Sequence, residues 1–167
     1  MSNLLNLQKT ELEKFLKESN AIESEYTKEA FENAWKAWKF LICFEELTLS
    51  RILECHRILM TDLNNRIAGK IRNVNVRVGF SSKLDFNKIK ESINKLLLRD
   101  SHTEEQIKQW HIDFENIHPF EDGNGRIGRI LYNFQRIKNG LPIHIIYEKN
   151  KYEYYDWFLN DSSQNLF

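Results

Sequence analysis

The scarcity of helix-breaking residues constrains this chain more than any other feature of its sequence. Only 2 prolines and 6 glycines occur among its 167 residues, and most of them fall in two short stretches. Elsewhere apolar residues recur at three- and four-residue spacing, which is typical of amphipathic helices with one buried face. We therefore expect one all-α domain, a compact bundle of long helices joined by short loops.

Capping residues and apolar periodicity place the expected helices along the chain. The aromatic residues of the second helix, such as Trp35 and Trp38, are interpreted as core rather than as a ligand-binding stripe, because they recur at helical spacing. The expected helices are a short first helix broken near 18–20, then Thr27 to about Leu47, Thr48 to near Asn64, Asp85 to Leu98, Thr103 to a stop before Pro119, and Gly125 to Lys138.

One segment departs from the helical period. From Asn73 to Val78 apolar and polar residues alternate strictly, which predicts a strand with one covered face. Gly69 precedes this segment and Gly79 follows it, so we expect a small β-hairpin over about residues 70–80. Because an isolated hairpin is marginally stable in water, it should lie against the helical body or a partner.

Charge and composition narrow the classes of partner. The chain carries 24 basic and 24 acidic residues, so its overall charge favours neither nucleic acid nor an acidic membrane surface. We see no signal peptide and no apolar run long enough to span a bilayer, and we expect a soluble cytoplasmic protein. Cys43 and Cys55 are expected to be buried free thiols, because neither lies in a metal-binding or redox motif.

The stretch from His118 to Arg129 reads HPFEDGNGRIGR and is the most informative part of the sequence. Glycines before a helix start let backbone N–H groups converge on an anion, and the helix dipole adds positive charge. Arg126 and Arg129 are spaced to add charge to the same anion. Asp122 offers an oxygen ligand for a divalent metal, and His118 can accept a proton near neutral pH.

Other sites built on similar residues fit this stretch less well. An EF-hand alignment on Gly125 puts Phe120 at the first ligand position and Leu131 in place of the bidentate glutamate, which excludes calcium. The HExxH zinc pattern and the GxxxxGK[ST] nucleotide loop are absent. The plain alternative is an ordinary turn with a capping histidine and surface arginines.

The stretch resembles the motif of the Fic family, HxFx[DE]GNGRxxR, at every fixed position. Residues 114–117 and 130–138 around it also resemble family sequence. So does the segment 68–79, which is similar to the flap hairpin of the family. The resemblance covers roughly residues 19–157 and implies a Fic-like helical fold.

The resemblance implies that AMP passes from ATP to a Ser, Thr or Tyr hydroxyl of a target protein, with the enzyme itself as one candidate target. His118 would deprotonate this hydroxyl, and Asp122 would hold Mg²⁺ or Mn²⁺ against the phosphates. Arg129 would contact the γ-phosphate. The anion hole would consist of Gly123, Asn124, Gly125 and Arg126, and the flap residues Val74, Asn75, Val76 and Arg77 would hold the target by strand addition.

Residues 19–24 read SNAIES and resemble the inhibitory motif [ST]xxxE[GN] of the family. The arrangement is class II-like, because this motif precedes the core: residues 1–26 would form an inhibitory segment and 27–167 the catalytic core. By this resemblance Ser19 and Glu23 belong to the inhibitory motif, and Glu23 pairs with Arg129 and prevents productive ATP binding. Ser24 departs from the usual Gly or Asn, so the turn after Glu23 is expected to differ.

Three questions stay open at this level. In some relatives the inhibitory glutamate supports AMP removal, so a de-AMPylase is one alternative, and a silent peptide-binding module is another. Phosphocholine transfer uses the same motif. The C-terminal aromatic residues are interpreted as core, with an adenine pocket as the alternative; they are Tyr152, Tyr154, Tyr155, Trp157 and Phe158.

Overall fold

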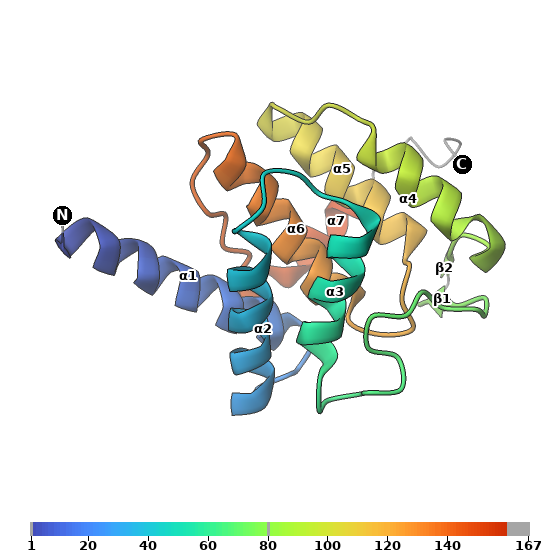
Figure 1. The fold of residues 1–167 in the computed structure, drawn as a ribbon, viewed down its shortest axis with the longest axis horizontal. Coiled ribbons are helices and arrows are strands. Elements are labelled where there is room, and N and C mark those ends of the chain that lie inside the picture. The colour runs from blue at the N-terminus through green and yellow to red at the C-terminus, as the bar shows by residue number, and fades with distance from the viewer. Residues whose placement is uncertain (1, 80, 160–167) are drawn as a thin grey trace.

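Helices make up most of the computed structural model, which describes residues 2–79 and 81–159 (Figure 1). The predicted class, all-α with one small hairpin, is confirmed. Two short 3₁₀ turns, η1 (Phe86–Lys88) and η2 (Glu148–Asn150), precede the fourth and seventh helices. The helices are α1 Ser2–Ile22, α2 Lys28–Leu41, α3 Leu49–Met60, α4 Ile89–Leu97, α5 Glu104–Ile117, α6 Asn124–Lys138 and α7 Lys151–Leu159.

Three predicted caps start helices as expected. The hydroxyls of Thr27 and Thr48 accept backbone N–H bonds at the starts of α2 and α3. Thr103 and Gln106 form a complete capping box at the start of α5. Each cap satisfies backbone donors that the helix itself leaves unpaired, which is why these local signals locate helix starts reliably.

Several predicted helix ends are wrong. The first helix does not break at 18–20 but continues to Ile22, because Ser19 and Asn20 are buried and packing overrides their local preference. The second helix ends at Leu41 rather than Leu47, and a turn follows in which the Phe44 N–H donates to the Leu41 carbonyl at 3.1 Å. Cys43 consequently lies beyond α2 and is exposed, whereas Cys55 is buried as predicted.

Similarly, α3 ends before the predicted Asn64. Its last helical residue is Met60. Asp62 adopts a left-handed backbone with φ of 61°, a conformation that cannot continue an α-helix.

The hydrophobic core lies between paired helices. α5 packs against α6 and α2 against α3, while α1 contacts α2 and α6, and α4 covers α5 (Figure 1). Side chains from all six of these helices meet in one buried cluster, which includes Phe15, Trp38, Ile52, Ile93, Phe114 and Leu131. This cluster holds α5 and α6 rigidly side by side and so fixes the loop that joins them.

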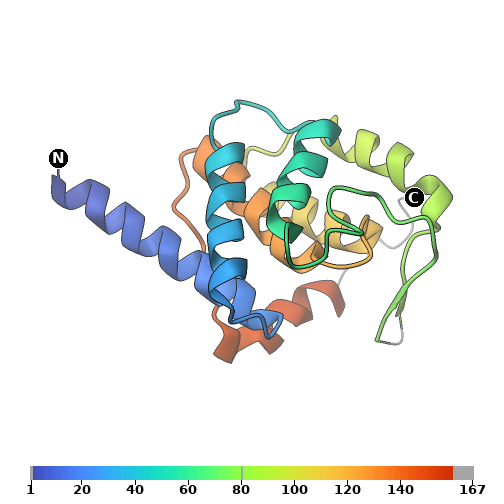
Figure 2. The same cartoon turned by 60° about the horizontal axis from the view of Figure 1, so that its bottom comes forward.

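The hairpin consists of β1 (Arg77–Val78) and β2 (Ser81–Ser82), paired antiparallel. Only the last two residues of the predicted strand 73–78 therefore pair. Its expected covered face is also wrong, because Val74 and Val78 are each about half exposed. Figure 2 shows the reason: the hairpin projects from the helical body, at the opposite end from the start of α1. Within the described ranges, no helix has both the length and the apolar character needed to cross a membrane.

Candidate active site

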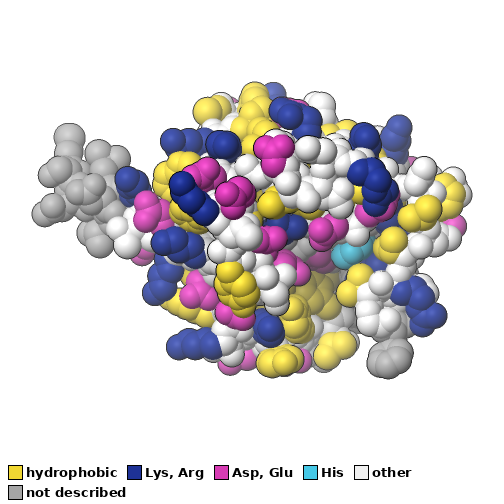
Figure 3. All heavy atoms as spheres, turned by 90° about the horizontal axis from the view of Figure 1, so that it is seen from below, with side chains coloured by type: hydrophobic (Ala, Val, Ile, Leu, Met, Phe, Trp, Pro, Cys, Tyr) yellow, Lys and Arg dark blue, Asp and Glu magenta, His cyan; other side chains and the backbone are white. Residues whose placement is uncertain are grey.

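A cavity of about 480 Å³ opens where α5, α6, α7, the hairpin and the end of α1 meet. The face seen in Figure 3 is hollowed, and acidic, hydrophobic and histidine side chains border the hollow. The lining of the cavity contains both polar and apolar side chains. The polar residues include Glu23, Lys83, Glu115, His118 and Arg129, Gly125 contributes backbone, and the apolar and aromatic residues are Val78, Tyr154, Tyr155, Phe158 and Leu159.

His118 terminates α5 and lines this cavity. His118 adopts a left-handed backbone with φ of 50° and ψ of 64°. The proline that follows it excludes the right-handed helical conformation at His118. Burial, together with the positive charges of Lys83 and Arg72, lowers the pKa of His118 to about 4. The imidazole is therefore neutral at physiological pH and able to accept a proton.

The loop after His118 is shaped by two side chains. Asn124 clamps the backbone of Phe120 through two hydrogen bonds of 2.9 Å, one donated and one accepted. His56 stacks on the Phe120 ring at 3.7 Å, and its Nε2 lies 3.0 Å from the carbonyl oxygen of Asp122. The side chain of Asn124 is thus committed to the loop, which leaves its backbone N–H to contribute to an anion hole. This role of His56 was not predicted from the sequence.

The start of α6 forms an anion-binding nest. Gly123 precedes the helix with φ of 78° and provides no side-chain cap, so the first-turn N–H groups remain available to a ligand. Arg126 is buried, and its Nε and Nη1 have no hydrogen-bond partner among the described residues. Because an unpaired buried donor is costly, these atoms indicate a place for an anion.

Asp122 lies at the mouth of the nest. Its Oδ1 accepts a 2.6 Å hydrogen bond from the Gly123 N–H, and its side chain is largely exposed. Among the described residues no group of three or more His, Cys, Asp or Glu side chains could hold a metal ion. One exposed carboxylate beside a phosphate nest nevertheless fits Mg²⁺, which commonly binds one carboxylate together with substrate phosphates and water.

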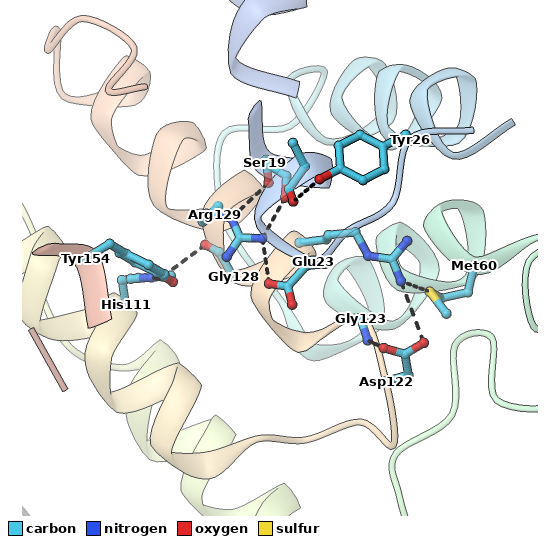
Figure 4. A network of polar contacts seen from close by, with 12 residues as sticks. Ser19, Glu23, Tyr26, Met60, His111, Asp122, Gly123, Gly128, Arg129 and Tyr154 are labelled. Atoms are coloured by element: carbon cyan, nitrogen blue, oxygen red, sulfur yellow. Dashed lines mark hydrogen bonds and ion pairs between the residues drawn. The ribbon is translucent and has the colours of Figure 1, made fainter. Parts of the chain in front are cut away.

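Arg129 is held by the segment that precedes α2 (Figure 4). Its Nε donates to the Ser19 hydroxyl at 2.9 Å, and its Nη2 donates to the Ser19 carbonyl and to Glu23 Oε1, each at 2.8 Å. The Glu23 carboxylate also rests on the first turn of α6, because a methyl group added at Gly125 would lie 2.2 Å from Oε1. Glu23 therefore places a negative charge at the nest.

The turn after Glu23 forms despite the unusual serine. Ser24 adopts a left-handed backbone with φ of 58°, the conformation that Gly and Asn adopt most readily. Hydrogen bonds from Ser24 to Ala21 and from Glu25 to Asn20 close the turn, at 2.9 and 3.0 Å. The serine thus accepts backbone strain to bring Glu23 to Arg129.

The two arginines of the motif hold different partners in this structure. Arg126 Nη2 lies 3.4 Å from the sulfur of Met60 and 3.7 Å from Asp122 Oδ2, whereas Arg129 binds Ser19 and Glu23. We predicted that both would serve one anion. In this structure the Glu23 carboxylate already pairs with Arg129, so only Arg126 is available to an anion.

The C-terminal aromatic residues divide between core and cavity. The Tyr154 hydroxyl donates to His111 Nε2 at 2.8 Å, and His111 Nδ1 donates to the carbonyl of Gly128 at 3.1 Å. Tyr154 is accordingly fixed in the interior. Tyr155 and Phe158 line the cavity, and the predicted core position of Tyr152 is wrong, because 72% of it is exposed.

Two ionisable residues of the cavity were not predicted. Burial raises the pKa of Glu115 to about 7, which the charge of Arg129 only partly offsets. Burial also lowers the pKa of Lys83. Oε1 of Glu115 has no partner among the described residues. No local signal marks either residue, because burial depends on neighbours distant in the chain, such as Gly128 of α6, against which the Glu115 carboxylate lies.

The predicted flap residues lie at the base and edge of the hairpin. Asn75 Oδ1 accepts the Phe86 N–H at 3.0 Å, and the Val76 carbonyl accepts the Lys83 N–H at 3.1 Å. Arg77 pairs with Ser82 in the register of the two strands. Within the described chain β1 pairs only with β2, so its other edge is open to an added strand.

The buried histidines predict a loss of stability in mild acid. Burial lowers the pKa of His56 and His118 to about 4 and of His111 to about 3. Between pH 6.5 and 4 the unfolded chain binds protons that the folded chain refuses, so the unfolding free energy falls as pH falls. Glu115, with a pKa of about 7, has the opposite effect. We expect the unfolding free energy to be roughly 3 kcal/mol lower at pH 5 than at pH 7.

Urea unfolding at each pH measures this change. The His102→Gln variant is the control, because His102 is exposed and its loss should leave the pH dependence unaltered. A stability profile that is flat between pH 7 and pH 5 would contradict the burial of the three histidines.

Comparisons with known proteins point to one family. The model of the Fic/DOC family matches residues 46–135. Protein adenylyltransferase fic-1 of Caenorhabditis elegans is 30% identical over 132 residues, which cover 71% of this chain and 26% of that protein. Protein adenylyltransferase Fic of Nematostella vectensis is 31% identical over 126 residues, covering 71% and 29%. The chain therefore spans between a quarter and a third of the length of these relatives.

Solved structures share the fold. Fic-1 of C. elegans superimposes with a TM-score of 0.78 at 22% identity, covering 93% of this chain and 56% of that one. A Fic family protein of Desulfovibrio desulfuricans gives a TM-score of 0.79 at 21% identity, covering 95% and 59%.

Proposed function

Because this chain belongs to the Fic/DOC family, we propose that it is a protein adenylyltransferase that moves AMP from ATP to a Ser, Thr or Tyr hydroxyl of a target protein. The observation that carries the proposal is one cavity that contains a neutral histidine, His118, beside the nest of α6. Related proteins named protein adenylyltransferases support it.

In the proposed reaction His118 acts as the general base. The imidazole takes the proton of the target hydroxyl while the oxygen of that hydroxyl attacks the α-phosphorus of ATP. A new P–O bond forms to the target, the bond between the α-phosphorus and the bridging oxygen breaks, and pyrophosphate leaves. The barrier falls mainly because the reacting groups are positioned and the developing charge meets fixed donors.

The nest and its arginines would hold the phosphates. The N–H groups of Asn124, Gly125 and Arg126 and the unpaired guanidinium donors of Arg126 supply hydrogen bonds to phosphate oxygens. Arg129 would bind the γ-phosphate once Glu23 withdraws. Asp122 would hold Mg²⁺, or Mn²⁺, which neutralises phosphate charge when bound.

The apolar side of the cavity would take the adenosine part of ATP. Tyr155, Phe158 and Val78 line the same cavity as Gly125 at the start of α6, and aromatic and apolar side chains suit the face of an adenine ring. The target would bind along the open edge of β1 by strand addition, so that its hydroxyl reaches His118.

We further propose that the enzyme is autoinhibited in the structure described. The Glu23 carboxylate pairs with Arg129 and lies against Gly125, so it occupies a place suited to a phosphate. A carboxylate and a phosphate compete for the same guanidinium fork. ATP would then bind in an unproductive pose until Glu23 moves away.

The test is transfer of radiolabel to protein in a host lysate and to the enzyme itself, in the presence of Mg²⁺. The Glu23→Gly variant should transfer label from α-³²P-ATP and none from γ-³²P-ATP, because AMP is retained and pyrophosphate released. Label from γ-³²P-ATP would indicate a kinase. Absence of label from either nucleotide, with folded enzyme, would count against adenylyl transfer.

A second candidate is removal of AMP from a modified protein. It is favoured by the position of Glu23, whose carboxylate lines the same cavity as His118 and could orient a water molecule. The Glu23→Gln variant separates the two activities, since hydrolysis of an AMP-modified protein should disappear while AMP transfer should rise. A silent peptide-binding module, by contrast, would show no increase in melting temperature with Mg²⁺ and ATP.

A further inference from the structure

A buried arginine joins the base of the hairpin to the backbone of His118. Arg72 is 2% exposed. Its guanidinium donates to the carbonyl of His118 from Nε at 2.7 Å and to that of Ile117 from Nη2 at 3.3 Å. The backbone N–H of Arg72 also donates to the Pro119 carbonyl at 3.0 Å. One residue therefore binds three consecutive carbonyl groups around the candidate base.

These carbonyl groups need partners. They follow the last turn of α5, where a helix leaves its final carbonyls unpaired and its dipole end is negative. A positively charged guanidinium satisfies both requirements. It also opposes relaxation of His118, whose left-handed backbone with φ of 50° is unfavourable for a residue with a side chain.

The same guanidinium holds both ends of the hairpin. Nη1 donates to the carbonyl of Val74 at 2.7 Å, before β1, and Nη2 donates to the carbonyl of Leu84 at 2.5 Å, after β2. Arg72 thus fixes the two points from which the hairpin projects. A lysine could not reproduce this arrangement, because an ammonium group lacks the planar fork that reaches four carbonyl groups at once.

We propose that Arg72 is a positioning residue that sets the imidazole of His118 and the hairpin in register with each other. This inference rests on the proposed role of His118 as base. Within the described part of the chain, the hydrogen bonds of the Arg72 guanidinium all go to backbone carbonyl groups and none to the nest or to Arg129. Its charge also contributes to lowering the pKa of His118, and this charge is retained in Arg72→Lys. Its loss should slow the transfer step and leave nucleotide binding largely intact.

The kinetic test compares Arg72→Lys and Arg72→Ala in the Glu23→Gly chain. We expect kcat for AMP transfer to fall about 100-fold, the size of effect that a displacement of about 1 Å in a catalytic group can cause. The KM for ATP should change less than about twofold. In a His118→Ala chain, removal of Arg72 should lower the residual rate little, because the imidazole that Arg72 positions is already absent.

The matched control is Arg66→Ala. Arg66 is exposed and bonds the side chain of Glu121 in the same loop, so its removal deletes a guanidinium contact without touching His118 or the hairpin. It should leave kcat unchanged. Three results would overturn the proposal. They are an equal loss of kcat in Arg66→Ala, a rise in KM that accounts for the whole effect of the Arg72 variants, and a further loss of rate of about 100-fold when Arg72 is removed from the His118→Ala chain.

A second measurement does not depend on activity. With ¹³C-labelled histidine, NMR should show the His118 ring signals shifted in folded Arg72→Lys protein, while those of exposed His102 stay in place. Unmoved His118 signals would refute the positioning role even if transfer were slow. Conversely, shifted signals in a protein without any AMP transfer would uphold the positioning role and reject the proposed activity.

Discussion

Replacing His118 by alanine is expected to lower AMP transfer by about 1,000-fold in the Glu23→Gly chain, within the range typical for loss of a general base. The imidazole is the group in the cavity that is neutral and close to the α6 nest, because burial and the charge of Lys83 hold its pKa at about 4. The measurement is the initial rate of label transfer from α-³²P-ATP. ATP binding, followed by the increase in melting temperature, should persist.

The same pKa sets the pH dependence of this reaction. Below about pH 4 the imidazolium has no lone pair, so the His118-dependent rate should fall as pH drops toward that value and should not depend on His118 titration above pH 6. His102→Ala serves as control because His102 is exposed and outside the cavity. Transfer by the His118→Ala variant at a rate near that of its parent would exclude His118 as the base.

Replacing Glu23 by glycine is expected to raise AMP transfer about 10- to 100-fold. The pair between Glu23 and Arg129 is a short charge-assisted hydrogen bond to a buried guanidinium, and such bonds contribute about 1.5–3 kcal/mol. Since about 1.4 kcal/mol corresponds to a factor of ten, releasing Arg129 should favour productive ATP binding by that amount. Initial rates measured with ATP below its KM report the change.

Two neighbouring substitutions sharpen this test. Glu25→Ala removes the next carboxylate along the chain, which bonds Thr27 rather than Arg129, and it should leave the rate unchanged. Ser24→Gly relieves the left-handed strain without touching the carboxylate, so it should tighten the Glu23 contact and lower the rate. A Glu23→Gly enzyme no faster than the original chain would reject autoinhibition.

Much of the local structure was predictable from the sequence. Thr27, Thr48 and Thr103 mark helix starts, and Pro119 marks the end of α5, because caps and proline act on backbone groups within a few residues. Helix ends were predicted less well, since burial of Ser19 and Asn20 carries α1 past a polar stretch that reads locally as a break.

The candidate site likewise contains residues that the sequence predicted and residues that it did not. The motif from His118 to Arg129 brings the histidine proposed as base, a glycine-rich turn and two arginines together because they follow one another along the chain. Arg72 and His56 were missed because each acts on a loop far from it in sequence. Lys83 and Glu115 were missed because only burial in the cavity makes their charges unusual.

The sequence by itself determined the class of fold, the starts of α2, α3 and α5, and the motif from His118 to Arg129, because short-range backbone chemistry specifies each of them. The pairing of Glu23 with Arg129 was expected from a resemblance, but its geometry depends on α1 packing beside α6. Tertiary structure alone decided the protonation of His118, the anchoring of the hairpin by Arg72 and the shape of the cavity. Each of these depends on desolvation and on contacts between segments that are distant in the chain, and no local pattern encodes them.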